Sequence, residues 1–211
     1  DVTPRRGWVR RHPVWSMVIF LAVIVVVIPV AVVAVFYNRT EIPNPDDVAT
    51  EQISEIYQSD GETMIGRIVP PQGNRTLVGL EQVPMHVREA VIAAEDRSFY
   101  SNEGFDPTGI GRAAIGQITG EDSAGGGSTI TQQYVKNTMV GDDPTYERKA
   151  KEIVIAAKMT NEWSKDQILA AYLNTIYFGR GAYGIAAAAT AYFDKPVEEL
   201  TVEEGALLAG V

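Results

Sequence analysis

Cysteine is absent from the 211-residue chain, which removes disulfides and thiolate metal sites from consideration. Basic residues are in the minority, because 18 Lys and Arg stand against 27 Asp and Glu and give a formal net charge of -9. Nucleic-acid binding needs a basic surface that neutralises phosphates, so we expect no nucleic-acid partner. The two histidines, His12 and His86, are isolated and lack ligand spacing.

A long apolar run near the N-terminus is the clearest physical signal. Residues 15–36 carry no charged side chain, and about 20 apolar residues are enough to span the hydrocarbon core of a bilayer. Pro29 lies inside the run, which membrane helices tolerate better than soluble ones. Arginines precede the run and acidic residues follow it, so the positive-inside rule predicts a cytoplasmic N-terminus. A cleaved signal peptide is the alternative, but the run is too long and lacks a small-residue cleavage site.

The sequence divides into four segments. We predict a basic cytoplasmic tail over 1–14, a transmembrane helix over 15–36, an extracytoplasmic linker over 37–79 and a helical domain over 80–211. Two β-prone runs in the linker flank the Asp-Gly dipeptide at 60–61 and predict a hairpin. The chain begins with Asp and stops within a helical pattern, so we expect a fragment whose last domain is truncated at its C-terminus.

Apolar periodicity and capping residues predict the helices of the last segment. Ser164 with Gln167, and Thr201 with Glu204, have the spacing of capping boxes. We expect helices near 83–98, 107–119, 129–139, 144–162, 164–178, 183–193 and 201–211. The predicted fold class is therefore mainly α, with one transmembrane helix and a small β-hairpin at the entry of the helical domain.

The first candidate for chemistry is the acid pair that ends the first of these helices, Glu95-Asp96. Glu95 lies two turns after Val87, which places it on the apolar stripe of the helix. A carboxylate kept partly dry there would suit a general base. A capped acid, or one paired with Arg97 or Arg112, is equally compatible with the residues alone. Asp96 faces elsewhere, and we expect it to hold the following loop.

A glycine-rich stretch comes directly before the second candidate, the helix expected over 129–139. Glycines ahead of Ser128 and Thr129 expose the first turn of this helix, and free N–H groups at a helix start bind anions. The pattern is not a Walker A loop, because the Gly-Lys-Ser/Thr ending is missing. Gln132 and Lys136 share one helix face, which offers donors and one cation to phosphate or sugar. An N-capped surface helix after a flexible loop is the alternative.

A third candidate is the pair of Arg148 and Glu152, which are four residues apart on one predicted helix face. A plain ion pair on the helix surface would explain this spacing. The same face continues into Ile155, so a partly buried acid with a basic neighbour is equally allowed. Glu95 and Glu152 could then form a carboxylate pair for sugar chemistry.

Four short motifs follow one another along residues 95–174: EDRSFYSNEGFD, GGSTITQQYVKN, RKAKE and ILAAYLN. Together they resemble the family 51 glycosyltransferases, the peptidoglycan polymerase domain of class A penicillin-binding proteins. The family's first motif is Glu-Asp-x-x-Phe-x-x-His-x-Gly-x-Asp, and Asn102 stands here where the family usually has histidine. Asparagine keeps hydrogen-bonding capacity but cannot be a cation, so we expect no proton transfer at this position.

The resemblance implies roles for individual residues. Glu95 is implied to be the general base that takes a proton from the acceptor sugar hydroxyl. Glu152 is implied to lie near the donor pyrophosphate and to help hold a divalent metal such as Mg²⁺, while Lys136 and Arg148 stabilise the leaving group. The further implied substrate contacts are Ser128, Thr129, Gln132, Gln133, Asp96, Phe99 and Asn102.

The resemblance also implies a lysozyme-like helical fold on the outer face of the bacterial cell membrane. The implied substrates are lipid II and the growing glycan strand, which are joined into a β-1,4 glycan with release of polyprenyl pyrophosphate. Other cell-wall synthesis proteins are implied partners. The hairpin resembles the segment that joins the polymerase to a transpeptidase domain in bifunctional members. That domain's Ser-x-x-Lys signature does not occur here, so we expect no covalent binding of β-lactams.

Two rival functions fit parts of the sequence. A lytic transglycosylase or lysozyme-like hydrolase would share the fold class and a helix-end Glu, but it needs no cations for a pyrophosphate, which Lys136 and Arg148 would supply. A membrane scaffold for wall synthesis would use the anchor without any chemistry. Lipid II polymerisation distinguishes both from a polymerase.

Overall fold

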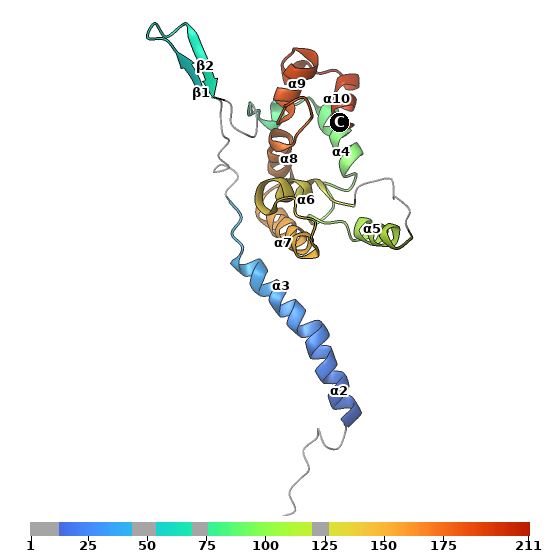
Figure 1. Cartoon of the computed structure of the whole chain (residues 1–211). Helices are drawn as coiled ribbons and strands as arrows, with labels where there is room; N and C mark the ends of the chain where they lie inside the picture. The colour runs from blue at the N-terminus through green and yellow to red at the C-terminus, as the bar shows by residue number, and fades with distance from the viewer. Residues whose placement is uncertain (1–12, 44–53, 69–75, 120–126) are drawn as a thin grey trace, which may run out of the picture. The chain divides into compact units, whose positions relative to one another are not determined.

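The computed structural model of the chain describes residues 13–43, 54–68, 76–119 and 127–211 (Figure 1). Most of the predicted basic tail, parts of the predicted linker and most of the glycine-rich stretch ahead of Ser128 lie outside these ranges. The chain forms two compact units, residues 1–41 and 42–211, which are described separately below.

The first unit is a single helical rod. It consists of α2 (Pro13–Ala22), the π-helical turn η1 (Val23–Val27) and α3 (Ile28–Arg39). Pro29 has no N–H and its ring would press on the carbonyl four residues earlier, so the helix widens just ahead of it, and the N–H of Ile28 reaches back to the carbonyl of Val23. Residues 14–39 are long and apolar enough to cross a membrane, which agrees with the span predicted over 15–36.

The second unit begins with the predicted hairpin. Strands β1 (Ser54–Tyr57) and β2 (Met64–Ile68) pair antiparallel, with Ser54 opposite Ile68. The carboxylate of Asp60 orders the turn, because it accepts hydrogen bonds from the backbone N–H groups of Glu62 and Thr63, both at 3.0 Å. Gly61 follows at a φ of +74°, where glycine meets no steric penalty. The Asp-Gly signal therefore identified the turn correctly.

The other elements described in the second unit are helices and helical turns. The α-helices are α4 (Met85–Glu95), α5 (Pro107–Thr119), α6 (Ile130–Val135), α7 (Tyr146–Glu162), α8 (Lys165–Thr175), α9 (Ile185–Phe193) and α10 (Val202–Ala209). A π-helical turn, η4 (Lys136–Val140), continues α6, and the 3-10 turns η3 (Leu80–Gln82) and η5 (Val197–Glu199) precede α4 and α10. The predicted mainly α fold, with one small hairpin and one apolar N-terminal helix, is confirmed.

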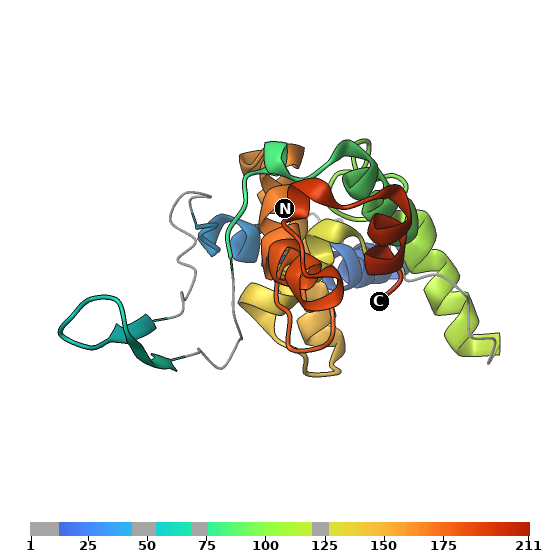
Figure 2. The ribbon, with the colours of Figure 1, turned by 90° about the horizontal axis from the view of Figure 1, so that it is seen from above.

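Helix α6 is the centre of the core, because it packs against both α7 and α8, while α10 lies along α4 (Figure 2). Its residues Ile130 and Val135 are completely buried. Helix α8 contributes Ile168 and Leu169, which are completely buried, and Tyr172, which is 2% exposed. The motifs for the candidate site thus lie on helices that share one core.

Side-chain caps fix where these helices begin. The two predicted capping boxes are confirmed: Gln167 N donates to Ser164 Oγ at 3.2 Å, and Thr201 N donates to Glu204 Oε2 at 2.8 Å. The segment ahead of α4 is held by Asn174 of α8, whose amide accepts from Val78 N at 3.0 Å and donates to Val78 O at 2.9 Å. This pairing imitates one rung of a β-ladder and ties the entry of the domain to its core.

Two helices are shorter than predicted. The first ends at Glu95 rather than near 98, because Asp96 leaves the helical region with φ -156° and ψ 83°. The fifth ends at Thr175 rather than near 178, and Tyr177 then pairs with Tyr183 in an isolated β-bridge. Apolar periodicity continued past both ends, so it could not mark them.

Candidate active site

Glu95 lies at the exposed C-terminal end of α4, which corrects the expectation of a dry carboxylate. Val87 and Val91 on the same stripe are buried, but Glu95 itself is exposed. The cause is the helix end, since the chain turns away at Asp96 and no further turn covers the acid. Glu95 lines an open cleft of about 430 Å³ that also includes Arg112 and Ser128.

The partner of Glu95 is an amide rather than an arginine. Gln133 Nε2 donates to Glu95 Oε2 at 2.6 Å. Among the described residues no ion pair to Glu95 is found, and Arg97 instead donates from Nε to the carbonyl of Ala93 at 3.2 Å. The salt-bridged alternative is therefore not what the structure contains.

Asp96 is the buried member of the acid pair, with 7% of its surface exposed. Its carboxylate accepts from the backbone N–H groups of Ser98 and Ile130, both at 3.2 Å, and from the side chains of Ser98 and Asn102. The expectation that Asp96 holds the following loop is confirmed. Because protein donors surround its oxygens, Asp96 positions the loop rather than offering a free acceptor to a substrate.

Asn102 and Phe99, two further implied substrate contacts, also serve this loop. The amide of Asn102 donates to Asp96, and its oxygen accepts from Lys165 Nζ at 2.9 Å. Phe99 is completely buried, which contradicts a substrate contact, and its ring centroid lies 4.8 Å from Lys165 Nζ. Burial lowers the pKa of Lys165, and the charge of Asp96 offsets part of this effect.

The start of α6 is capped from within the protein. Thr129 and Gln132 form a capping box, with Thr129 N donating to Gln132 Oε1 at 2.9 Å. Gln132 is completely buried, so the implied substrate contact is wrong for this side chain. Ile130 N–H donates to Asp96, which means that the anion at this helix start is the protein's own carboxylate. Ser128 and Thr129 do line the cleft of Glu95.

Glu152 is the second acid and is 1% exposed, so a plain surface pair is excluded. Arg148 Nη1 lies 2.6 Å from Glu152 Oε2, and Lys149 Nζ bonds the other carboxylate oxygen. Lys149 also donates to Ser128 Oγ at 2.7 Å. The two cations leave this buried cluster with a net positive charge.

Lys149 is a site residue that sequence reasoning missed. Its signal was present, because Lys149 and Glu152 are three residues apart and therefore neighbours on a helix. Lys149 is also the residue that connects the glycine-rich motif, through Ser128, to the second acid.

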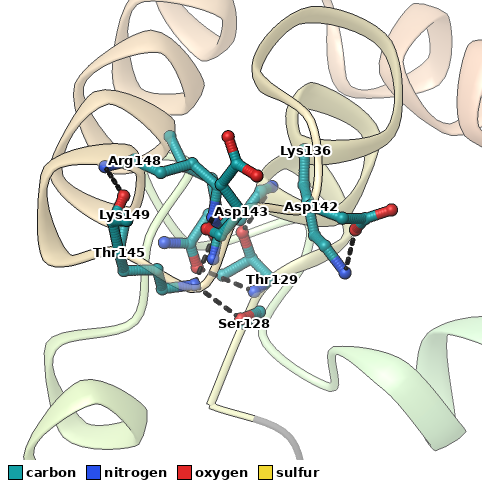
Figure 3. A network of polar contacts seen from close by, with 10 residues as sticks. Ser128, Thr129, Lys136, Asp142, Asp143, Thr145, Arg148 and Lys149 are labelled. Carbon is teal, nitrogen blue, oxygen red and sulfur yellow. Dashed lines mark hydrogen bonds and ion pairs between the residues drawn. The ribbon is translucent and has the colours of Figure 1, made fainter.

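Lys136 completes a second cavity of about 290 Å³, lined by Ser128, Gln133, Asn137 and Glu152 as well. Its Nζ lies 2.8 Å from Asp142 Oδ1, and this pairing lowers the pKa of Asp142 (Figure 3). Ser128 lines both cavities, so the cavity of Glu95 and the cavity of Lys136 adjoin there.

A divalent metal does not fit the donors found at Glu152. Both of its carboxylate oxygens are bonded to cationic side chains. Over the part of the chain that the structure describes, no group of three Asp, Glu, His or Cys side chains could hold a metal ion. Mg²⁺ prefers several oxygen ligands that carry negative charge. A single carboxylate paired with two cations gives a net positive charge instead, which repels a metal cation.

Comparison with known proteins places this geometry in a family. The family model described as Transglycosylase matches residues 61–211. The chain belongs to the transglycosylase family. This match covers the exposed acid, the capped helix and the cationic cluster, which are therefore features of a transglycosylase domain.

Similar proteins carry the name penicillin-binding protein. The chain is 56% identical to penicillin-binding protein 1A of Mycobacterium tuberculosis and 55% identical to that of Mycolicibacterium smegmatis, over 97% of its length in each case. It is 48% identical to penicillin-binding protein 1F of Bacillus subtilis over 65% of its length. The transglycosylase chain spans only 24% and 26% of the two mycobacterial relatives.

Proposed function

We propose that this transglycosylase domain is a peptidoglycan glycosyltransferase that polymerises lipid II. The observation that carries the proposal is the pair of cavities that adjoin at Ser128. The first is lined by the exposed carboxylate of Glu95, and the second by Lys136 and by the buried Glu152, whose ion-pair partners are Arg148 and Lys149. A transfer reaction needs both, because one substrate must lose a proton while the other loses an anionic leaving group.

The proposed chemistry assigns the acceptor to the cavity of Glu95. Its carboxylate takes the proton of the 4-hydroxyl of the incoming lipid II sugar, and that oxygen attacks the anomeric carbon of the growing glycan. A new C–O bond forms, and the bond from the anomeric carbon to the pyrophosphate breaks. Attack from the face opposite the leaving group turns an α-linked donor into a β-1,4-linked product. The exposure of Glu95 suits a large acceptor that must reach it.

The leaving polyprenyl pyrophosphate is assigned to the second cavity. Arg148, Lys149 and Lys136 supply positive charge where the negative charge develops, and cations held in place before the reaction need no reorganisation during it. Glu152 acts here as a positioning residue, because its buried carboxylate holds Arg148 and Lys149. Ser128 and Gln133 line the passage between the two substrates.

The apolar helix at the N-terminus supports a place at the membrane. We propose that residues 14–39 anchor the chain in the bacterial cell membrane, with a cytoplasmic N-terminus and an extracytoplasmic catalytic domain. Both substrates carry polyprenyl tails, so anchoring confines their encounter to the membrane surface. If the chain is part of a protein as long as its penicillin-binding relatives, the other domains of that protein and other cell-wall synthesis proteins would be further partners.

Polymerisation of labelled lipid II by the purified chain in detergent tests this function. We expect glycan strands that disappear with a moenomycin-type inhibitor, and a loss on the order of 100-fold or more in Glu95→Gln. Glu103→Gln is the matched control, because Glu103 is an exposed acid of the same loop outside both cavities. Glu95→Gln should keep the thermal midpoint of the parent.

The rival functions give other outcomes. A hydrolase would shorten isolated sacculi and leave lipid II unpolymerised. A scaffold would be indifferent to Glu95→Gln and to Glu152→Gln in a folded protein. Polymer formation by Glu95→Gln at the parent rate would remove Glu95 as the base.

A further inference from the structure

Three side chains from three helices form one hydrogen-bonded series that ends at the candidate base. Tyr172 on α8 donates from its hydroxyl to Gln133 Oε1 at 3.0 Å. Gln133 on α6 donates from Nε2 to Glu95 Oε2, on α4, at 2.6 Å. Tyr172 lines neither of the two cavities, so its connection to the site runs through Gln133.

The chemistry of the groups fixes the direction of this series. An ionised carboxylate only accepts hydrogen bonds, so Glu95 requires the amide N–H₂ of Gln133. The amide oxygen then points the other way and requires a donor, which Tyr172 supplies. Burial, together with the nearby charge of Glu95, raises the pKa of Tyr172, so its hydroxyl keeps its proton at the pH of any ordinary assay.

Burial differs sharply along the series. Tyr172, on helix α8 that packs against α6, is 2% exposed. Gln133 is half-buried, and Glu95 is exposed. An exposed glutamate at a helix end has several rotamers of similar energy. The hydrogen bond from Gln133 favours one of them, and the hydroxyl of Tyr172 keeps the amide from turning its oxygen toward the carboxylate.

The geometry points to Tyr172 as a positioning residue for the transfer reaction, acting through Gln133 to orient the carboxylate of Glu95. This inference rests on the proposed function of Glu95 as the base. The aromatic ring of Tyr172 packs in the core, whereas its hydroxyl fixes the orientation of the Gln133 amide. The two roles can be separated, because phenylalanine keeps the ring and removes only the hydroxyl.

The test is the kinetics of Tyr172→Phe in lipid II polymerisation by the full chain. We expect kcat to fall on the order of 10-fold, with KM for lipid II unchanged, because the base is misoriented while the binding surface is intact. Tyr192→Phe is the matched control: Tyr192 donates to Phe178 O at 2.8 Å from α9 and lines neither cavity. The control should keep the parent kcat.

A double-mutant cycle with Gln133→Ala separates positioning from stability. In that background Tyr172→Phe should change kcat by less than about two-fold, because the link is already broken. A Tyr172→Phe effect that persists undiminished without Gln133, or a kcat equal to that of Tyr192→Phe, would overturn the inference. A loss of folding stability would appear in both Gln133 backgrounds, so the cycle still decides. Absence of polymer from the parent chain would instead overturn the proposed function.

Discussion

The amide of Asn102 donates to both carboxylate oxygens of Asp96, at 3.1 and 2.9 Å. The oxygen of the same amide accepts from Lys165 Nζ and from Gly104 N. A neutral side chain thus connects a buried anion to a half-buried cation. The loop that follows Glu95 depends on this arrangement, which the side chain of Asn102 holds together.

Asn102→Asp should destabilise the fold by about 3 kcal/mol, because a second carboxylate would face the buried carboxylate of Asp96. Urea unfolding at neutral pH measures this loss. Asn161→Asp, an exposed position on α7, is the control. Equal stability of the two variants at neutral pH would argue against a charge-sensitive loop.

Lys149→Met should destabilise the protein by about 3–5 kcal/mol, since it removes one of two cations from a carboxylate that is 1% exposed. Lys151→Met is the matched control on the same helix, because Lys151 pairs with the exposed Glu147 and should matter little. Thermal unfolding of both variants checks the difference. Similar midpoints would mean that Arg148 alone satisfies Glu152.

Gly104→Ala should cost about 3 kcal/mol or more, for two reasons. Gly104 has a φ of +88°, and a Cβ there would lie 2.4 Å from the carbonyl oxygen of Ala156. Gly181→Ala shares the positive φ, at +73°, but meets no atom within 4 Å, and should cost only on the order of 1 kcal/mol. Denaturant midpoints of the two variants separate the cost of backbone strain from the cost of the steric clash with Ala156. Equal losses of stability in the two variants would show that the clash with Ala156 contributes nothing.

Asp142 should give stability a measurable pH dependence. The hydrogen bond and charge of Lys136 hold the pKa of Asp142 below its ordinary value of 3.8. Such a group contributes stability that is present above the unfolded pKa and is lost as pH falls through the folded pKa. The difference in unfolding free energy between the parent and Asp142→Asn should therefore be constant above about pH 5 and vanish at lower pH.

Urea unfolding of both proteins across that range is the measurement, and about 1 M salt should reduce the difference because the pair is exposed. A difference that stays the same at all pH values would show that the asparagine acts through packing rather than through charge.

The sequence predicted the elements of the fold better than their ends. Capping residues such as Ser164 and Thr201 act locally, so the sequence predicts directly where their helices begin. The end of α4 depends on Asp96 bonding to Ile130, 34 residues away, and no local pattern contains that contact. The prediction of a partly buried Glu95 was wrong for this reason. The apolar periodicity was correct, but the helix ends at the acid itself.

The candidate site shows the same limit. The burial of Glu152 was one of two readings that the spacing allowed, and only tertiary packing decided between them. Gln132 was predicted to be a donor on an accessible helix face, but it is buried in a capping box with Thr129, which has the same spacing as the boxes of Ser164 and Thr201. The roles of Lys165 and Tyr172 depend on helices brought together by the core, which a single sequence does not reveal.

The contact of Gly104 with Ala156 has a consequence for redesign. The loop after Glu95 and helix α7, which carries Glu152, meet through backbone atoms, and Ala156 is one turn beyond Glu152. The distance between the two elements is therefore fixed by main-chain contact and does not depend on the choice of neighbouring side chains. Exposed loop positions such as Ser101 and Glu103 can be varied without changing this spacing, as long as Gly104 remains without a side chain.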